Sequence, residues 1–301
     1  MKRRRIGHDY FGRCIYMLTI KQRRPLLGHI TGNGDEEPVV MHLTPIGQAV
    51  SDAVQGLPGY YPTVEILACQ LMPDHLHVVL FVHDRLPVHL GQVVNGFKTG
   101  CNRTYRTLGL NTHIPTLWEE GFNDTILDNN GQLQRMIDYV RDNPRRYAIK
   151  RAHPELFRVQ HHITVGDYTF AAMGNIFLLD APQLIQVQCS RKITPEQLAT
   201  QREHCLQQAR NGAVAVSPSI SQGEKDIMRA IFDAGFPTII LRENGFAPLA
   251  KPGGRRFDAC AEGRLLLLAP WQHHNRRRDI QRQQCLSLNQ IAQAICSRTH
   301  Q

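Results

Sequence analysis

The alternation of apolar and polar residues divides the first half of the chain into short segments of recognisable type. Runs of β-branched and aromatic residues predict four strands, at 12–20, 64–71, 76–82 and 125–127. Apolar residues at helical spacing predict three helices, at 45–54, 88–107 and 131–142. Thr44 and Pro45 suit the start of the first helix, and Pro144 should end the helix predicted at 131–142. The stretch 28–38 is rich in Gly, Asn and acidic residues and should form a loop.

These elements follow the order strand, helix, strand, strand, helix, strand. That order is typical of the ferredoxin-like (split βαβ) arrangement, an α+β fold with an antiparallel sheet. We expect the helices to pack on one face of this sheet. The pattern changes near Phe170, so we assign residues 1–170 to a first domain.

The second half alternates strands and helices, which is typical of parallel α/β units. Strands are predicted at 184–189, 213–216, 238–242 and 264–269, and helices after 194 and at 224–234 and 286–296. We therefore expect a smaller Rossmann-like domain of unknown role over 171–301. Its loop Ser217–Gly223 is either a serine-capped turn or a phosphate-holding loop, and only Gly223 matches a glycine fingerprint.

Composition narrows the function classes. A chain of 301 residues fits two domains, and its formal net charge of +9 favours a polyanionic partner such as nucleic acid. There is no apolar run of membrane-spanning length, and the basic residues 2–5 are not followed by the apolar stretch of a secretory signal. The eight cysteines form no C-x-x-C pair, so we expect reduced thiols and a cytoplasmic protein.

Two segments carry residues suited to chemistry. His75 and His77 are two apart in a predicted strand, so both imidazoles should lie on one sheet face, with Leu76 in the core. This pair is either half of a metal site or simply two exposed histidines. Tyr139 and Asn143 are four apart on a helix and share one face; singly, they would be a core aromatic and a helix cap. Together the four residues supply a nucleophile and three metal-binding atoms.

At these residues the chain resembles the REP-associated tyrosine transposases, a family of single-tyrosine HUH transposases. Segment 72–77 has the sequence MPDHLH and resembles the HUH motif. Segments 117–124 and 139–144 resemble the signature W-x-x-x-F-x-D…Y-[IV]-x-x-N-P, and the pair Phe97-Lys98 fits the family's first long helix. The resemblance covers roughly the first half of the chain; the Gly- and acid-rich insertion 32–37 and the whole second half depart from it.

The resemblance implies a set of roles. His75, His77 and Asn143 would bind Mg²⁺ or Mn²⁺, and Tyr139 would attack single-stranded DNA, next to a hairpin, to form a 5′-phosphotyrosine. The cut strand could then be rejoined, as in DNA transposition. Whether Tyr139 acts in its own subunit or across a homodimer stays open.

Four basic residues are candidate DNA contacts, although each also fits a solvated surface position: Lys98, from the resemblance, and Arg103, Arg145 and Arg146, which flank the proposed site in sequence. Asp74 and Asp124 fit structural roles at turns better than catalytic ones. Two alternatives are a non-catalytic, domesticated binder of hairpin nucleic acid, and a nucleotide sensor in which the second domain controls a nuclease.

Overall fold

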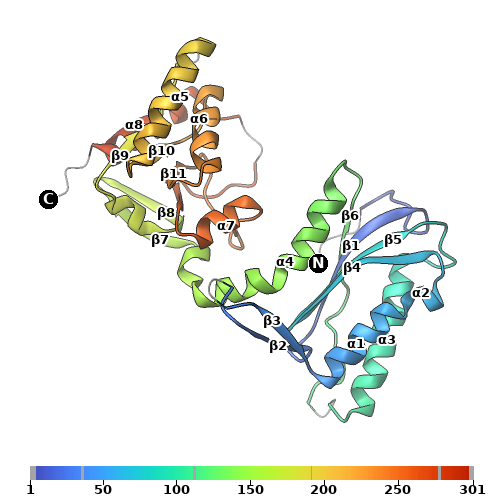
Figure 1. Ribbon diagram of the computed structural model, residues 1–301. Helices are drawn as coiled ribbons and strands as arrows, with labels where there is room; N and C mark the ends of the chain where they lie inside the picture. The colour runs from blue at the N-terminus through green and yellow to red at the C-terminus, as the bar shows by residue number, and fades with distance from the viewer. Residues whose placement is uncertain (1–4, 35–36, 111–112, 191, 277–278, 298–301) are drawn as a thin grey trace. The chain divides into compact units, whose positions relative to one another are not determined.

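The computed structural model describes residues 5–34, 37–110, 113–190, 192–276 and 279–297. The basic residues 2–4 therefore lie outside the described part. The chain divides into two compact units, Met1–Ala152 and His153–Gln301 (Figure 1). The predicted boundary at residue 170 is too late, because it falls inside a strand of the second unit's sheet. No helix in the described ranges is long and apolar enough to cross a membrane.

The first unit is built on a four-stranded sheet in the order β4-β5-β1-β6, in which every neighbouring pair is antiparallel. Its strands are β1 (Cys14–Lys21), β4 (Val64–Met72), β5 (His75–Val82) and β6 (Asn123–Ile126). The predicted strands are thus all present. The register sets Thr19 of β1 and Gln70 of β4 directly opposite His77 of β5, one on each side.

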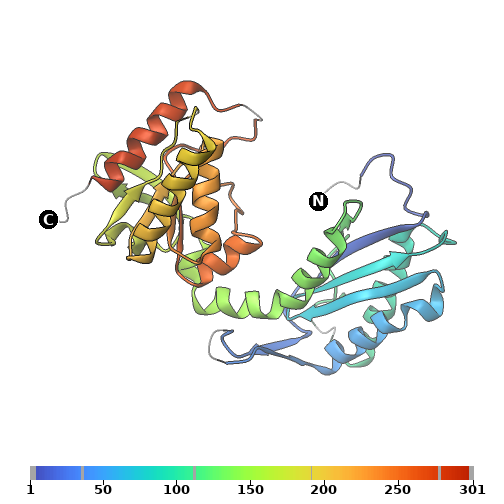
Figure 2. The same ribbon diagram turned by 45° about the horizontal axis from the view of Figure 1, so that its top comes forward.

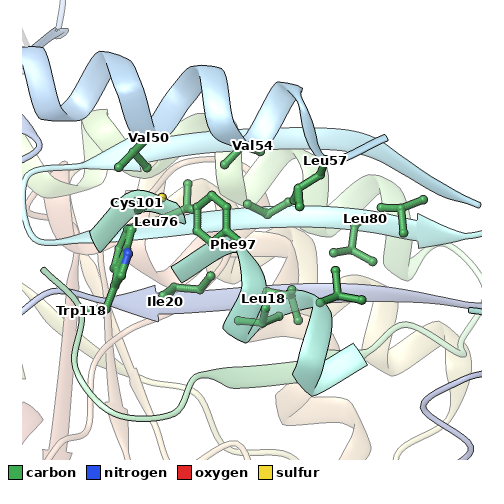
Figure 3. Close-up of a cluster of buried hydrophobic side chains, with 14 of the residues drawn as sticks. Leu18, Ile20, Val50, Val54, Leu57, Leu76, Leu80, Phe97, Cys101 and Trp118 are labelled. Carbon is green, nitrogen blue, oxygen red and sulfur yellow. The ribbon is translucent and has the colours of Figure 1, made fainter. Parts of the chain in front are cut away.

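One face of this sheet carries α1 (Pro45–Gln55), the short α2 (Leu57–Tyr60) and α3 (Leu90–Thr107). The hydroxyl of Thr44 accepts a hydrogen bond from the Gly47 N–H at 3.1 Å, which confirms the predicted helix start. Between helices and sheet lies an apolar core, in which Leu76 and Leu80 of β5 meet Phe97 of α3 (Figure 3).

The opposite face is covered by α4 (Gln132–Ala152), so the prediction of helices on one face only was wrong. Val140 of α4 is fully buried against Met17, Ala68 and Val79 of the sheet. A strand covered on both faces needs apolar residues at odd and even positions alike. That explains the nearly continuous apolar run in the second half of β5.

α4 also continues through Pro144, where the sequence predicted its end. Proline removes one helical hydrogen bond and crowds the preceding turn, and Figure 2 shows α4 bent along its length. Two ion pairs span the proline, because the Asp142 carboxylate pairs with both Arg145 and Arg146 in the next turn. Beyond Pro144, Ile149 of the same helix is buried. Tertiary packing here outweighs a local helix-stop signal.

The stretch expected to be a loop contains a hairpin, β2 (Gly28–Thr31) with β3 (Val40–Leu43). Gly28 suits this pairing because a Cβ there would lie 2.2 Å from the carbonyl oxygen of His42. Gly34, at a positive φ of 84°, brings the hairpin against α4: a Cβ there would lie 3.0 Å from the side chain of Ile149.

The second unit has a six-stranded sheet in the order β7-β8-β12-β11-β10-β9. The four strands from β12 to β9 are parallel, as predicted, and the antiparallel strands β8 and β7 extend one edge. The strands are β7 (Gln160–Val165), β8 (Tyr168–Gly174), β9 (Leu184–Gln186), β10 (Val214–Ser217), β11 (Thr238–Leu241) and β12 (Leu265–Ala269).

The helices of this unit are α5 (Pro195–Arg210), α6 (Gln222–Asp233), α7 (Arg255–Ala261) and α8 (Arg282–Cys296), with 3-10 turns η1 (Pro154–Phe157) and η2 (Ile176–Asp180). α5 and α6 pack on one face, where Cys205 and Ile227 meet Ala215 of β10. α8 packs on the other, where Leu288 meets the neighbouring residues of β10 and β12. The result is a sheet between two helical layers.

Candidate active site

His75 and His77 lie side by side on the face of β5 that α4 covers. Their Nε2 atoms are 3.1 Å apart, and their rings meet edge to face with centroids at 4.6 Å. His77 is 5% exposed, so it is part of the protein interior rather than a solvated surface residue. Leu76 points into the core on the opposite face, as strand alternation predicts.

The outer nitrogen of each imidazole, Nδ1, has a hydrogen-bond partner of its own. Nδ1 of His75 is 2.6 Å from a carboxylate oxygen of Asp74, and Nδ1 of His77 is 2.9 Å from the hydroxyl of Thr19. The hydrogen bond with His75 holds the pKa of Asp74 below its usual value. Asp74 therefore orients a histidine, which the sequence did not indicate. Asp124 has the structural role expected of it, since it accepts a hydrogen bond from Tyr10 at 2.8 Å.

His77 is held in its neutral form. Burial, and then the nearby His75, lower the pKa of His77 to about 3. A neutral imidazole keeps a lone pair on one ring nitrogen, which is the state that binds a metal ion.

The histidine pair fits a divalent ion. Two nitrogens bound about 2.1 Å from one ion at a right angle are about 3.0 Å apart, close to the 3.1 Å between the two Nε2 atoms. Partners on both outer nitrogens are the usual support for such ligands. Within the described ranges, no three His, Cys, Asp or Glu side chains gather as a metal-binding group, and the third ligand that the resemblance implies is an asparagine.

Asn143 is suited to that role. It is 7% exposed on α4, and its Nδ2 atom donates a hydrogen bond to the carbonyl oxygen of Tyr139 at 2.9 Å. That bond fixes the amide one helical turn beyond Tyr139 and leaves its Oδ1 atom as an acceptor. An amide oxygen together with two imidazoles would make a mixed N/O donor set without a thiolate, which is compatible with Mg²⁺ or Mn²⁺.

Tyr139 meets the histidines from α4. Its ring centroid lies 5.9 Å from that of His77, in an edge-to-face arrangement. With 40% of its surface exposed, Tyr139 is open to a strand arriving from solvent. The fold thus brings His77 and Tyr139 together from distant parts of the chain.

A charged cluster borders this tyrosine. The Arg146 guanidinium carbon is 5.9 Å from the ring centroid of Tyr139. Asp142 accepts hydrogen bonds from Arg145 at 2.6 Å and from Arg146 at 2.5 Å. Burial alone would raise the pKa of Asp142, but these two bonds outweigh it and the pKa lies below its usual value. Two of the three arginines named as candidate DNA contacts, Arg145 and Arg146, therefore lie on the helix that carries Tyr139.

The other two named contacts, Lys98 and Arg103, lie on α3, which packs on the opposite sheet face. The Lys98 ammonium donates to the carbonyl oxygens of Glu119 at 2.6 Å and Gly121 at 2.8 Å, and burial lowers its pKa. Lys98 thus holds the loop that leads into β6. Arg103 is exposed on α3, and the structure does not bring either residue to the histidines.

In the second unit, the Ser217–Gly223 loop is a serine-capped turn. Ser221 caps α6, and the Glu224 carboxylate, 2% exposed, accepts hydrogen bonds from the N–H groups of Ile220 and Ser221 at 2.7 and 3.1 Å. A side chain of the protein therefore occupies N–H groups that a phosphate would need. This geometry favours the first of the two interpretations that the sequence left open.

The chain is similar to known proteins over about half of its length. No protein-family model matches the chain. An uncharacterized protein of Haemophilus influenzae is 24% identical over 159 residues, which is 46% of this chain and 83% of the relative.

Among solved structures, the chain is similar to a REP-associated tyrosine transposase bound to a REP hairpin, with 17% identity, a TM-score of 0.36, and coverage of 49% of this chain and 74% of that one. It is also similar to the single-stranded DNA-binding DNA processing protein A of Helicobacter pylori, with 17% identity, a TM-score of 0.35, and coverage of 46% and 66%.

Proposed function

We propose that the first unit is a metal-dependent HUH nuclease that cuts and rejoins single-stranded DNA through Tyr139. The observation that carries this proposal is the combination of two imidazole Nε2 atoms 3.1 Å apart with a half-exposed tyrosine ring 5.9 Å from one of them. A metal ligand pair supplies charge neutralisation, and an adjacent exposed phenol supplies a nucleophile. The basic character of the chain suits a DNA strand as substrate.

The fold assignment belongs to the same proposal. The strand order β4-β5-β1-β6, with α1 before β4 and α3 before β6, supports a split βαβ sheet for the first unit. Four parallel strands between two helical layers support a Rossmann-like second unit. In the first unit the reactive residues lie on the face that α4 covers.

Strand cleavage follows from the nucleophile. The phenol oxygen of Tyr139 attacks the phosphorus of a phosphodiester, a bond forms from that oxygen to phosphorus, and the bond from phosphorus to O3′ breaks. The phenol proton is lost and the departing O3′ takes up a proton, which leaves a 3′-hydroxyl and a 5′-phosphotyrosine. Attack by a 3′-hydroxyl on that linkage reverses the sequence and rejoins DNA without an external energy source.

The protein has to make the phenol reactive. At neutral pH about one ordinary tyrosine in a thousand is ionised, a deficit of roughly 4 kcal/mol. A divalent ion held by His75, His77 and Asn143 would neutralise charge on the scissile phosphate. The chain itself contributes the Arg146 guanidinium, whose carbon lies 5.9 Å from the centroid of the Tyr139 ring.

A covalent-adduct assay tests this proposal. Purified protein is incubated with Mn²⁺ or Mg²⁺ and hairpin-bearing single-stranded DNA, labelled 3′ of the cut, and run on a denaturing gel. We expect a metal-dependent shifted band that Tyr139→Phe and His75→Ala abolish. Tyr147→Phe, which alters another tyrosine of α4, is the matched control and should keep the band. DNA binding without any band would favour the non-catalytic binder instead.

A further inference from the structure

The β2–β3 hairpin, which the resemblance to transposases does not account for, encloses a recess against α4. The recess has a volume of about 510 Å³. Val39, just before β3, and Met41 of β3 line one side of the recess, β4 contributes Gln70, and α4 contributes Arg141 and Arg145. The volume lies within the range of small-ligand sites and accommodates a single nucleotide.

The recess adjoins the histidine pair. Gln70 pairs directly with His77 across the β4–β5 ladder, so both side chains stand on the same sheet face. Such cross-strand neighbours have Cβ atoms about 5 Å apart. On the α4 side, the recess is lined by Asp142, whose carboxylate also binds Arg146 beside Tyr139. The recess is therefore connected to the histidine pair through Gln70 and to the surroundings of Tyr139 through Asp142.

The walls suit a flat heteroaromatic ring. Val39, Met41 and Pro144 provide apolar surface, and the Gln70 amide offers both a donor and an acceptor to base edges. Arg141 is exposed at the edge of the recess and pairs with no acidic group in the described part of the chain, so it is available to a phosphate or to the face of a base.

We propose that this recess binds the base of the unpaired nucleotide that flanks the cut, and so sets the base preference of cleavage at that position. The inference rests on the nuclease activity proposed above and deepens it by assigning the β2–β3 hairpin to substrate selection. Val39 and Met41 line the recess, whereas Val40, which lies between them in the sequence, does not line it and is 45% exposed.

The test compares matched substitutions at two neighbouring residues, Val39, which precedes β3, and Val40, the first residue of β3. Val39→Phe fills the recess, and Val40→Phe adds the same ring outside it. Each protein is given Mn²⁺ and a single-stranded DNA library randomised at the positions on either side of the cut. Both the DNA covalently linked to Tyr139, which carries the 3′ side of the cut, and the released strand with its 3′-hydroxyl are then sequenced. We expect the wild type and Val40→Phe to prefer one base by about tenfold at a flanking position, which corresponds to about 1.4 kcal/mol. Val39→Phe should reduce this to under about twofold.

A second readout does not require cleavage. In the Tyr139→Phe background, DNA carrying 5-iododeoxyuridine at the flanking position is photocross-linked, and the attached peptide is identified by mass spectrometry. We expect attachment to the peptide that contains Val39 and Met41. If Tyr139 adducts form, but Val39→Phe keeps the wild-type base preference and the cross-links fall on other peptides, the recess does not bind the base. The nuclease proposal would be unaffected by that result. If no Tyr139 adduct forms with any DNA, both proposals fail.

Discussion

Asp74→Asn isolates the contact that orients the first histidine. In the wild type, the Asp74 carboxylate lies 2.6 Å from Nδ1 of His75, so Nδ1–H donates to a charged acceptor and Nε2 keeps its lone pair facing His77. The amide of asparagine is nearly the same size but neutral. It also offers an NH₂ group, which stabilises the ring tautomer with the proton on Nε2, the wrong one for a metal ligand.

The expected effect is on metal affinity. Removing an outer-shell partner of a histidine ligand costs about 10- to 100-fold in affinity, which corresponds to about 1.4–2.8 kcal/mol. Asp74 is half exposed, and its pKa lies below the usual value because His75 donates to it. A carboxyl with a depressed pKa contributes at pH values above its unfolded pKa and loses the contribution as pH falls through its folded pKa. The comparison therefore belongs at neutral pH.

Titration with Mn²⁺, followed by electron paramagnetic resonance of the free ion, measures this affinity directly without DNA. Asp138→Asn is the control, because Asp138 is an exposed α4 residue whose partner is Gln134 rather than a histidine. We expect Asp74→Asn to bind Mn²⁺ at least about tenfold more weakly than Asp138→Asn, at equal thermal stability. Equal affinities in the two variants would show that the carboxylate does not orient a metal ligand.

Three further predictions concern stability. Because the pKa of His77 is lowered from 6.5 to about 3, the unfolded chain binds the extra proton and the unfolding free energy should fall as pH drops from 6.5 toward 3; His77→Gln should flatten this slope in denaturant titrations. Pro144→Ala should raise the unfolding free energy by about 1–3 kcal/mol, because it restores a helical hydrogen bond, and a loss of stability would contradict that expectation. The same substitution should lower the adduct yield if the bend at Pro144 positions Tyr139. Glu224→Gln should cost about 1–3 kcal/mol in the second unit, because it weakens acceptors for buried N–H groups, and should leave adduct formation unchanged.

Local signals predicted much of the fold. Strand alternation correctly placed His75 and His77 on one face and Leu76 in the core, because side-chain period in a strand is fixed by the backbone. Capping chemistry correctly placed the starts of α1 and α5, where Thr44 and Thr194 accept hydrogen bonds from the first turn.

The misses depend on particular contacts that the residue pattern does not reveal. The four-residue strands β2 and β3 carry little apolar pattern of their own and depend on each other and on contact with α4. α4 passes Pro144 because Asp142 binds Arg145 and Arg146 across the proline. The orienting role of Asp74 depends on a 2.6 Å contact that residue spacing does not reveal.

The placement of the histidines on β5 has a consequence for hydrogen exchange. β5 is an inner strand, paired on both edges and covered on both faces, so its amides should exchange with solvent only through opening of the whole first unit. Tyr139 lies instead on a helix whose hydrogen-bond ladder is interrupted by Pro144. In the proposed function, the histidine pair would therefore be rigid before DNA binds, and adjustment to each incoming or departing strand would fall to the helix that carries Tyr139.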